Sequence, residues 1–250
     1  MARIPIALQL YSVREACAGD FEGTVKAVAE MGYEGVEFAG YYDRSAQEIR
    51  DLCDDLGLKV AGTHIRIDTL LGNGLAATVE FNNTLGNCYL IVPGLAEEYR
   101  ESADAWRRTA GVFNEISRRL DAENMRTGYH NHTMEFEELD GQIPWDLFCE
   151  GTAERVVTQL DIGHCLRAGG DPVAALNKYP RRAQLVHVKE YAAVDEAALV
   201  GEGDVDWSVM FEACETVGDT RWYIVEQERY PVSPMESVER CLANLRKLGK

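Results

Sequence analysis

The segment from Gly128 to Phe136, Gly-Tyr-His-Asn-His-Thr-Met-Glu-Phe, holds the densest group of potential metal ligands and proton carriers in the sequence. The imidazoles of His130 and His132 and the carboxylate of Glu135 all fall within it. Imidazole nitrogen and carboxylate oxygen without thiolate suit a borderline or hard divalent ion such as Mn²⁺, Co²⁺, Mg²⁺ or Zn²⁺. We therefore expect this segment to form one wall of a divalent-metal site.

The other candidates are histidines and carboxylates at the ends of apolar runs. All five histidines of the chain occupy such positions: His64, His130, His132, His164 and His187. The carboxylates are Glu37, Glu135, Asp161, Glu190, Glu226 and Glu228. A single histidine is more often a packing residue than a ligand, but packing does not explain five at equivalent places. Asp161 and Glu226, which directly end apolar runs, are the strongest acidic candidates, whereas Glu190 and Glu228 are explained equally well as solvated charges.

An ion held by such ligands would polarise a carbonyl and stabilise the enediolate that forms as a proton leaves the neighbouring carbon. That chemistry also needs a base and an acid with tuned pKa values. Burial and neighbouring like charges both shift the pKa of a carboxylate. The same group of residues can therefore supply both the ligands and the proton carriers.

Eight apolar runs alternate with amphipathic segments and must position these side chains. The predicted strands are residues 4–10, 35–38, 59–64, 88–93, 126–130, 156–161, 183–187 and 222–226. The predicted helices are residues 20–32, 45–56, 75–85, 102–120, 145–150, 171–179, 206–214 and 233–248. Eight strand–helix units in 250 residues are typical of a (β/α)8 TIM barrel, whose active sites lie where the C-terminal ends of the strands meet.

We expect one barrel domain over residues 1–250, since no linker or charge block divides the chain. A doubly wound open sheet is the alternative fold. It would need a glycine-rich phosphate-binding turn after the first strand. Residues 11–14, Tyr-Ser-Val-Arg, are not such a turn.

Composition restricts the partners. A net charge of −17 repels nucleic acid and anionic membranes. The N-terminus lacks a signal-peptide pattern and no apolar run is long enough to span a membrane, so we expect a cytoplasmic protein. Seven cysteines without CxxC spacing indicate reduced, mostly buried thiols rather than a disulfide framework or a thiolate zinc site. The oligomeric state, a homo-oligomer included, stays open.

Several motifs together resemble one superfamily across nearly the whole chain. They are Tyr-His-Asn-His-x-x-Glu-Phe (129–136), Gln-Leu-Asp-Ile-Gly-His (159–164), Val-His-Val-Lys-Glu (186–190), Gly-Glu-Gly-Asp-Val-Asp-Trp (201–207) and Val-Glu-Gln-Glu (225–228), with Gln-Leu-Tyr-Ser-Val-Arg (9–14) and Gly-Val-Glu-Phe (35–38). This set is similar to the sugar isomerase/epimerase-like superfamily, with a xylose-isomerase-type TIM barrel that is shared with AP endonuclease family 2.

The resemblance implies a divalent metal held from strands five to eight, with Asp161, His187 and Glu226 as the ligands of the last three. Ketose epimerases of the superfamily place a glutamate inside strand five, where this chain has Tyr129 or His130. We expect Glu135 to reach back as the fourth ligand, with His130 as the alternative. The expected catalytic residues are Glu135, Glu226 and His130, and the expected substrate-binding residues are His64, His132, His164 and Lys189.

The resemblance favours a metal-dependent isomerase or epimerase that acts on a ketose or related polyol. We expect an uncharged sugar or cyclitol because the acidic loop of residues 201–206 argues against a phosphate site. One alternative is a lyase of the inosose dehydratase or keto-glycoside lyase type, which shares the first proton abstraction. A second is a barrel that binds a sugar without catalysis. The endonuclease IV branch is disfavoured because the chain is acidic.

Overall fold

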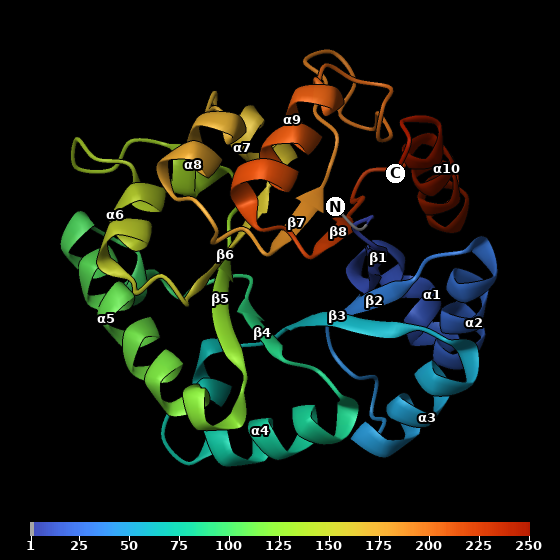
Figure 1. Cartoon of the computed structure of the whole chain (residues 1–250), viewed down its shortest axis with the longest axis horizontal. Helices are drawn as coiled ribbons and strands as arrows, with labels where there is room; N and C mark the ends of the chain where they lie inside the picture. Colours follow the sequence, from blue (N-terminus) through green and yellow to red (C-terminus); the bar gives the residue numbers. More distant parts are fainter. Residues whose placement is uncertain (1–2) are drawn as a thin grey trace.

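Eight parallel strands form a closed barrel in the order in which they occur along the chain (Figure 1). The computed structural model describes residues 3–250. The strands are β1 (Ile6–Gln9), β2 (Gly35–Phe38), β3 (Lys59–His64), β4 (Tyr89–Val92), β5 (Arg126–His130), β6 (Val157–Asp161), β7 (Leu185–Val188) and β8 (Trp222–Val225). The barrel closes where β1 pairs with β8. The predicted (β/α)8 barrel is confirmed, and the closed sheet excludes the doubly wound alternative.

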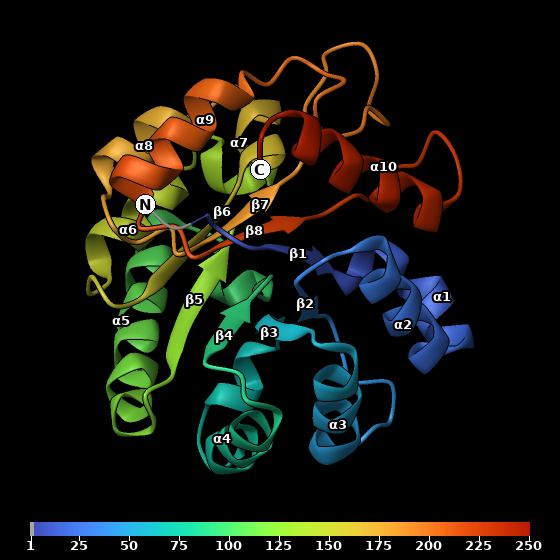
Figure 2. The same cartoon turned by 45° about the vertical axis from the view of Figure 1, so that its right-hand side comes forward.

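Helices cover the outside of the barrel, as Figures 1 and 2 show. They are α1 (Arg14–Gly19), α2 (Phe21–Met31), α3 (Ala46–Leu56), α4 (Gly74–Leu85), α5 (Ala103–Leu120), α6 (Pro144–Gly151), α7 (Ile162–Arg167), α8 (Pro172–Lys178), α9 (Trp207–Ala213) and α10 (Pro234–Lys247). Each predicted helix is present within a few residues of its predicted ends. The short helices α1 and α7 lie outside the predicted set, because six residues are too few to show a helical repeat of apolar positions.

Local sequence signals set the helix ends. Ser45 and Glu48 form a capping box at the start of α3, in which each side chain accepts a hydrogen bond from the backbone N–H of the other residue. Ser233 caps α10 through the backbone N–H of Glu236. Gly57 ends α3 with a φ of 68°, a left-handed conformation that glycine adopts without a steric penalty.

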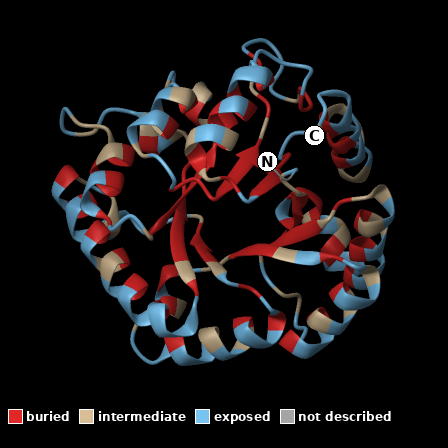
Figure 3. Ribbon diagram, viewed as in Figure 1, coloured by how far each residue is buried: buried red, intermediate tan, exposed pale blue. Residues whose placement is uncertain are grey.

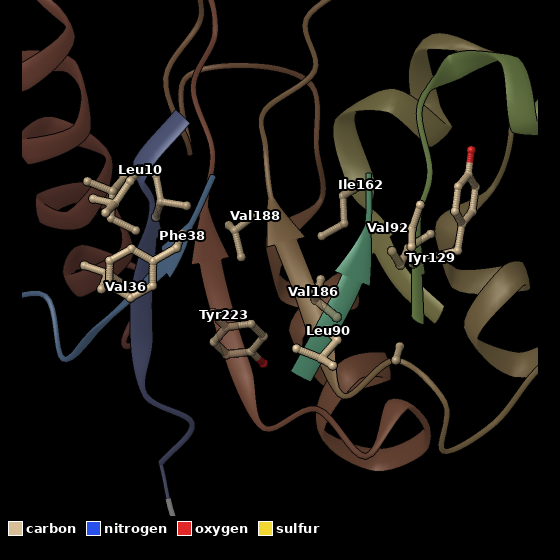
Figure 4. Packing of buried hydrophobic residues seen from close by; sticks show 14 of the residues in the cluster. Leu10, Val36, Phe38, Leu90, Val92, Tyr129, Ile162, Val186, Val188 and Tyr223 are labelled. Atoms are coloured by element: carbon tan, nitrogen blue, oxygen red, sulfur yellow. The ribbon is translucent and has the colours of Figure 1, made fainter. Parts of the chain in front are cut away.

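The strands are buried on both faces (Figure 3), which explains their continuous apolar runs. Outward-facing residues such as Val36, Leu90, Val186 and Tyr223 pack under the helices (Figure 4). The interior of the barrel holds a separate apolar cluster of Ala7, Ala61, Ile91, Val157, Leu185, Trp222 and Ile224. Because successive strand residues alternate between the two faces, the inward positions that follow this cluster toward the C-terminal ends include Gln9, Glu37, Gln159, His187 and Glu226. The interior of the barrel is therefore apolar toward the N-terminal ends of the strands, which we call the bottom, and polar toward their C-terminal ends, the top.

Two expectations from composition concern the whole chain. The seven cysteines are free within residues 3–250, and six are buried while Cys88 is exposed, as expected. In the same range, no helix combines the length and the apolar character that a membrane crossing requires.

Candidate metal centre

The structure brings all five histidines together at the C-terminal end of the barrel. The ring centroid of His130 lies 4.5–5.0 Å from those of three other histidines: 5.0 Å from His64, 4.5 Å from His187 and 4.9 Å from His132. His164 lies 5.0 Å from His132. The parallel topology produces this arrangement, because it directs the ends of all eight strands to one face.

Four side chains from consecutive strands converge within this group. They are His130 of β5, Asp161 of β6, His187 of β7 and Glu226, which directly follows β8. One potential ligand atom from each lies within 4.8 Å of the other three. Ligands of a single ion, each about 2.0–2.2 Å from it, lie at most roughly 4.4 Å apart, so the cluster needs only small movements to surround one ion. We refer to these four residues as the metal cluster.

The protonation states suit metal binding. Burial and the neighbouring His187 and His64 hold the pKa of His130 well below its ordinary value, so its imidazole is neutral. Burial would raise the pKa of Glu226, but the charges on Lys189 and His187 hold it well below its usual range. Burial would lower the pKa of His187, but Glu226 and Glu37 raise it to about 10 in the metal-free chain. The cluster thus offers the neutral imidazole of His130 and the ionised carboxylate of Glu226. A metal ion can take the place of the positive charge on His187.

Two buried polar atoms of the cluster support the same interpretation. Oδ2 of Asp161 and Nδ1 of His130 have no hydrogen-bond partner among residues 3–250. The other oxygen of Asp161 accepts a hydrogen bond from the backbone N–H of His164 and caps α7. Buried polar atoms are nearly always hydrogen-bonded, so a carboxylate oxygen held only by ion-pair contacts with Lys189 and His187, and an imidazole with an unpaired nitrogen, fit a divalent ion with nitrogen and oxygen ligands.

Glu135, expected as the fourth ligand, lies outside the metal cluster. Its oxygens accept hydrogen bonds from the Tyr129 hydroxyl and from the backbone N–H of His132, each at 2.7 Å. Burial raises the pKa of this carboxyl above its ordinary value. Both oxygens are used to hold the turn after β5, because residues 133–136 form a 3₁₀ helix that points Glu135 back at its own strand. This geometry replaces Glu135 by His130 in the proposed ligand set and gives Glu135 a positioning role.

Lys189, His164 and Glu228 line the outer side of the cluster. Nζ of Lys189 lies 3.0 Å from Nε2 of His164, 2.6 Å from Glu228, 3.1 Å from Glu226 and 3.3 Å from Oδ2 of Asp161. Burial would lower the pKa of Lys189, but the carboxylates of Asp161, Glu226 and Glu228 raise it above its ordinary value. Its ammonium therefore stays charged and can donate to a substrate oxygen.

A pocket of about 430 Å³ opens on the outer side of the metal cluster. It is lined by His164, Lys189 and Glu228 and by other residues that include Tyr11 and Arg14. This volume is in the range of small-molecule sites. His64, expected to bind substrate, lies deeper, where its Nε2 is 2.7 Å from Oε1 of Gln159.

A family model described as a xylose isomerase-like TIM barrel matches residues 25–248 of this chain. The chain belongs to the xylose isomerase-like TIM barrel family. The resemblance inferred from the motifs is thereby confirmed.

Relatives in this family have different activities. The rhizopine catabolism protein MocC of Rhizobium meliloti is 24% identical over 246 residues, which cover 84% of this chain and 75% of MocC. An inosose dehydratase of Clostridium beijerinckii is 23% identical over 249 residues, which cover 84% of this chain and 83% of the dehydratase. The crystal structure of a sugar phosphate isomerase/epimerase from Parabacteroides distasonis superposes with a TM-score of 0.85 and 25% identity over 98% of each chain.

Three polar residues beneath the metal cluster have no role in the predicted site. Gln9, Glu37 and Gln159 are completely buried, and both glutamine amides donate a hydrogen bond to the carboxylate of Glu37. The sequence signal that could have indicated these residues is a polar side chain at an inward position of an otherwise apolar strand. Only Glu37 was noted there as a carboxylate, because amides are usually explained by packing or solvent exposure.

Glu190, left open between function and surface charge, organises a loop. Its carboxylate accepts hydrogen bonds from the backbone N–H groups of Gly201 and Val205 and from the indole of Trp207. Asp206 accepts a hydrogen bond from the backbone N–H of Val209 at the start of α9. Residues 201–206 thus supply backbone donors to Glu190 and the cap of α9.

Proposed function

We propose that this protein is a divalent-metal-dependent enzyme that removes a proton from the carbon next to the carbonyl of a sugar or cyclitol. The observation that carries the proposal is the convergence of His130, Asp161, His187 and Glu226 beside a pocket of small-molecule size. A divalent ion held by these residues would supply Lewis-acid polarisation of the carbonyl oxygen.

We assign the removal of the proton to Glu226. Its carboxylate is nearly completely buried at the end of β8 and is ionised, as the low pKa set by Lys189 and His187 indicates. Burial excludes water, so the carboxylate does not have to shed a hydration shell before it accepts a proton.

Lys189 provides a proton donor on the outer side of the cluster. It bonds both His164 and Glu228, and His164 Nδ1 lies 3.3 Å from the Thr133 hydroxyl. A charged ammonium held in this way can neutralise a departing oxygen. His132, whose pKa burial and His164 lower to about 4, stays neutral and is suited to hydrogen-bond substrate hydroxyls.

The pocket favours an uncharged substrate. Arg167 and Arg229 both pair with Glu196, at 3.1 and 2.9 Å. Lys189 pairs with Glu228 in the same way. Because Arg167, Arg229 and Lys189 each already contact a carboxylate, we expect a neutral polyol rather than a phosphate.

Proton abstraction can lead to two outcomes, and two observations favour elimination over the epimerisation or isomerisation expected from the motifs. Position 130 on β5 carries a histidine, so the two-glutamate arrangement of an epimerase is lacking among the described residues. Inosose dehydratases are among the sequence relatives. In the elimination Glu226 takes the proton, the electron pair forms a carbon–carbon double bond, and the leaving oxygen departs with a proton from Lys189. We therefore put a lyase of the dehydratase or keto-glycoside lyase type first.

Incubation in deuterated water separates these outcomes. Keto-inositols, 3-keto-glucosides and simple ketoses would be incubated with metal-loaded protein and followed by mass spectrometry. Loss of water or of the aglycone supports elimination, whereas deuterium uptake without that loss supports epimerisation or isomerisation. Glu226→Gln should abolish both reactions, while Glu202→Gln, the same change at an exposed position, should abolish neither.

Metal analysis of the purified protein tests the proposal at its first step. About one divalent ion per chain is expected after loading with Mn²⁺ or Co²⁺. A protein that binds neither ion would contradict the proposal. A metal-loaded protein that binds sugars saturably without exchange or turnover would instead establish a non-catalytic sugar-binding barrel.

A further inference from the structure

Glu37, at an inward position of β2, is a completely buried carboxylate below the metal cluster. Its Oε2 accepts hydrogen bonds from Nε2 of Gln9 and from Nε2 of His187, each at 2.7 Å. Its Oε1 accepts from Nε2 of Gln159 at 2.6 Å. A buried carboxylate is costly unless its oxygens are satisfied. Three donors from β1, β6 and β7 meet that requirement here.

The barrel is shaped to accommodate this carboxylate. The register between β2 and β3 shifts between Val36 and Glu37, so that Glu37 pairs with Gly62. Irregularities of this kind re-aim a side chain. A Cβ at Gly62 would lie 2.9 Å from Oε1 of Glu37, closer than real Cβ contacts, so only glycine leaves room for the carboxylate.

The two nitrogens of His187 face different partners. Nε2 points down to Glu37, whereas Nδ1 points up, 2.9 Å from Glu226 and 3.8 Å from Oδ2 of Asp161. An ionised carboxylate can only accept a hydrogen bond. Contact with Glu37 therefore requires a proton on Nε2. In the metal-free chain the contact of Nδ1 with the ionised Glu226 requires a second proton, and this proton, which faces the metal cluster, is the one that a bound ion would replace.

We propose that Glu37 is a positioning residue that keeps the proton of His187 on Nε2 and thereby presents the lone pair of Nδ1 to the divalent ion. This inference rests on the proposed function. Carboxylate partners of metal-binding histidines fix ring orientation and raise ligand basicity, and their loss commonly costs about 10–100-fold in metal affinity.

Glu37→Gln tests the role without changing the size of the side chain. The amide oxygen can still accept from His187, and a flip of the Gln159 amide lets it accept from the new NH₂ group, so folding is expected to survive. A neutral amide is a weaker acceptor than a carboxylate. We expect the Kd for Mn²⁺, measured by calorimetry, to rise about 10–100-fold.

Glu190→Gln is the matched control. It makes the same change in a buried carboxylate whose partners are loop N–H groups and Trp207 rather than His187. It should lower the Tm and leave the Kd for Mn²⁺ within about twofold. Gly62→Ala is a second variant that keeps the charge of Glu37 but displaces its carboxylate, and it should weaken Mn²⁺ binding in the same direction.

The ¹⁵N chemical shifts of the His187 ring in Zn²⁺-loaded wild-type protein give a readout that needs no variant. The inference predicts a protonated Nε2 and a metal-bound Nδ1. Metal at Nε2, or a Glu37→Gln protein that binds Mn²⁺ as tightly as wild type, would overturn the role of Glu37 and leave the proposed function standing. If wild-type protein bound no divalent ion, the proposed function itself would fail.

Discussion

At the residue scale, the metal cluster combines two imidazoles and two carboxylates that have different secondary tasks. Asp161 caps α7 with one oxygen and directs the other into the cluster. His187 bonds Glu37 with one nitrogen and faces Glu226 with the other. Each bifunctional side chain is thereby fixed in orientation before an ion arrives, and this lowers the cost of ordering the ligands on binding.

Asp161→Asn separates the two tasks of that residue. The amide oxygen can still cap α7, so the free energy of unfolding of the metal-free protein should fall by less than about 1 kcal/mol, the usual cost of losing a cap. The lost charge should raise the Kd for Mn²⁺ by at least about 100-fold, beyond the range for outer partners of a metal site. Calorimetry and urea unfolding measure the two effects. Retained Mn²⁺ affinity would exclude Asp161 as a ligand.

Lys189→Met should affect the metal-free protein more than the metal-bound one. Without the ammonium, the carboxylates of Asp161, Glu226 and Glu228 keep only the charge of His187 beside them, and loss of one partner of a buried ion pair costs roughly 3 kcal/mol. Bound Mn²⁺ should remove part of that loss, as thermal unfolding with and without Mn²⁺ would show.

Turnover should fall about 10²–10⁴-fold in Lys189→Met, the usual contribution of a general acid. Lys189→Arg, which keeps the charge, serves as the control for stability. Lys189 would have no donor role if turnover in Lys189→Met stayed near the wild-type value.

At the element scale, the loop between β7 and α9 is held from within by Glu190. Its carboxylate joins Gly201, Val205 and Trp207, so a long connection that carries Lys189 at its start has a fixed path. The turn after β5 is held in the same way by Glu135, which fixes the backbone of His132. Each of these loops uses a buried carboxylate that accepts backbone N–H groups.

Glu190→Ala should lower the free energy of unfolding by about 3 kcal/mol, because it leaves the buried indole N–H of Trp207 and the part-buried N–H groups of Gly201 and Val205 without their charged acceptor. Trp207→Phe removes only the indole donor and should cost about 1–2 kcal/mol. Urea unfolding of both variants checks this order. A loss in Glu190→Ala no larger than that in Trp207→Phe would show that the backbone hydrogen bonds do not matter.

At the scale of the whole molecule, the barrel stacks a polar layer on an apolar one. Residues such as Ile91, Leu185 and Trp222 fill the lower interior, and the metal cluster lies above Glu37 and its amide partners. Because the four residues of the metal cluster come from β5, β6, β7 and the end of β8, an ion bound there would join half of the barrel wall.

Metal binding should therefore stabilise the fold. Free Mn²⁺ at 100 times its Kd adds about 2.7 kcal/mol to the free energy of unfolding, if the unfolded chain does not bind it. For a chain of this length the Tm should rise by roughly 5–11 °C. Thermal unfolding in Mn²⁺ and in chelator measures the shift, and Asp161→Asn should show little of it. An equal rise in both proteins would point to binding elsewhere.

The sequence by itself determined the barrel and the face that carries the site. Eight apolar runs separated by capped amphipathic helices specify the fold through local periodicity, and the ends of those runs indicated Asp161, His187 and Glu226 as candidate ligands. These signals are local, because a strand end and a helix cap can be recognised within a few residues.

Only the tertiary structure favours His130 over Glu135 as the proposed fourth ligand. The two residues lie close together in one segment of the sequence. The choice depends on the turn after β5, in which Glu135 accepts hydrogen bonds from Tyr129 and His132. The same holds for Glu37, whose partners Gln9, Gln159 and His187 come from three other strands. Closure of the barrel brings them together, and a contact created by closure leaves no pattern in the order of residues along the chain.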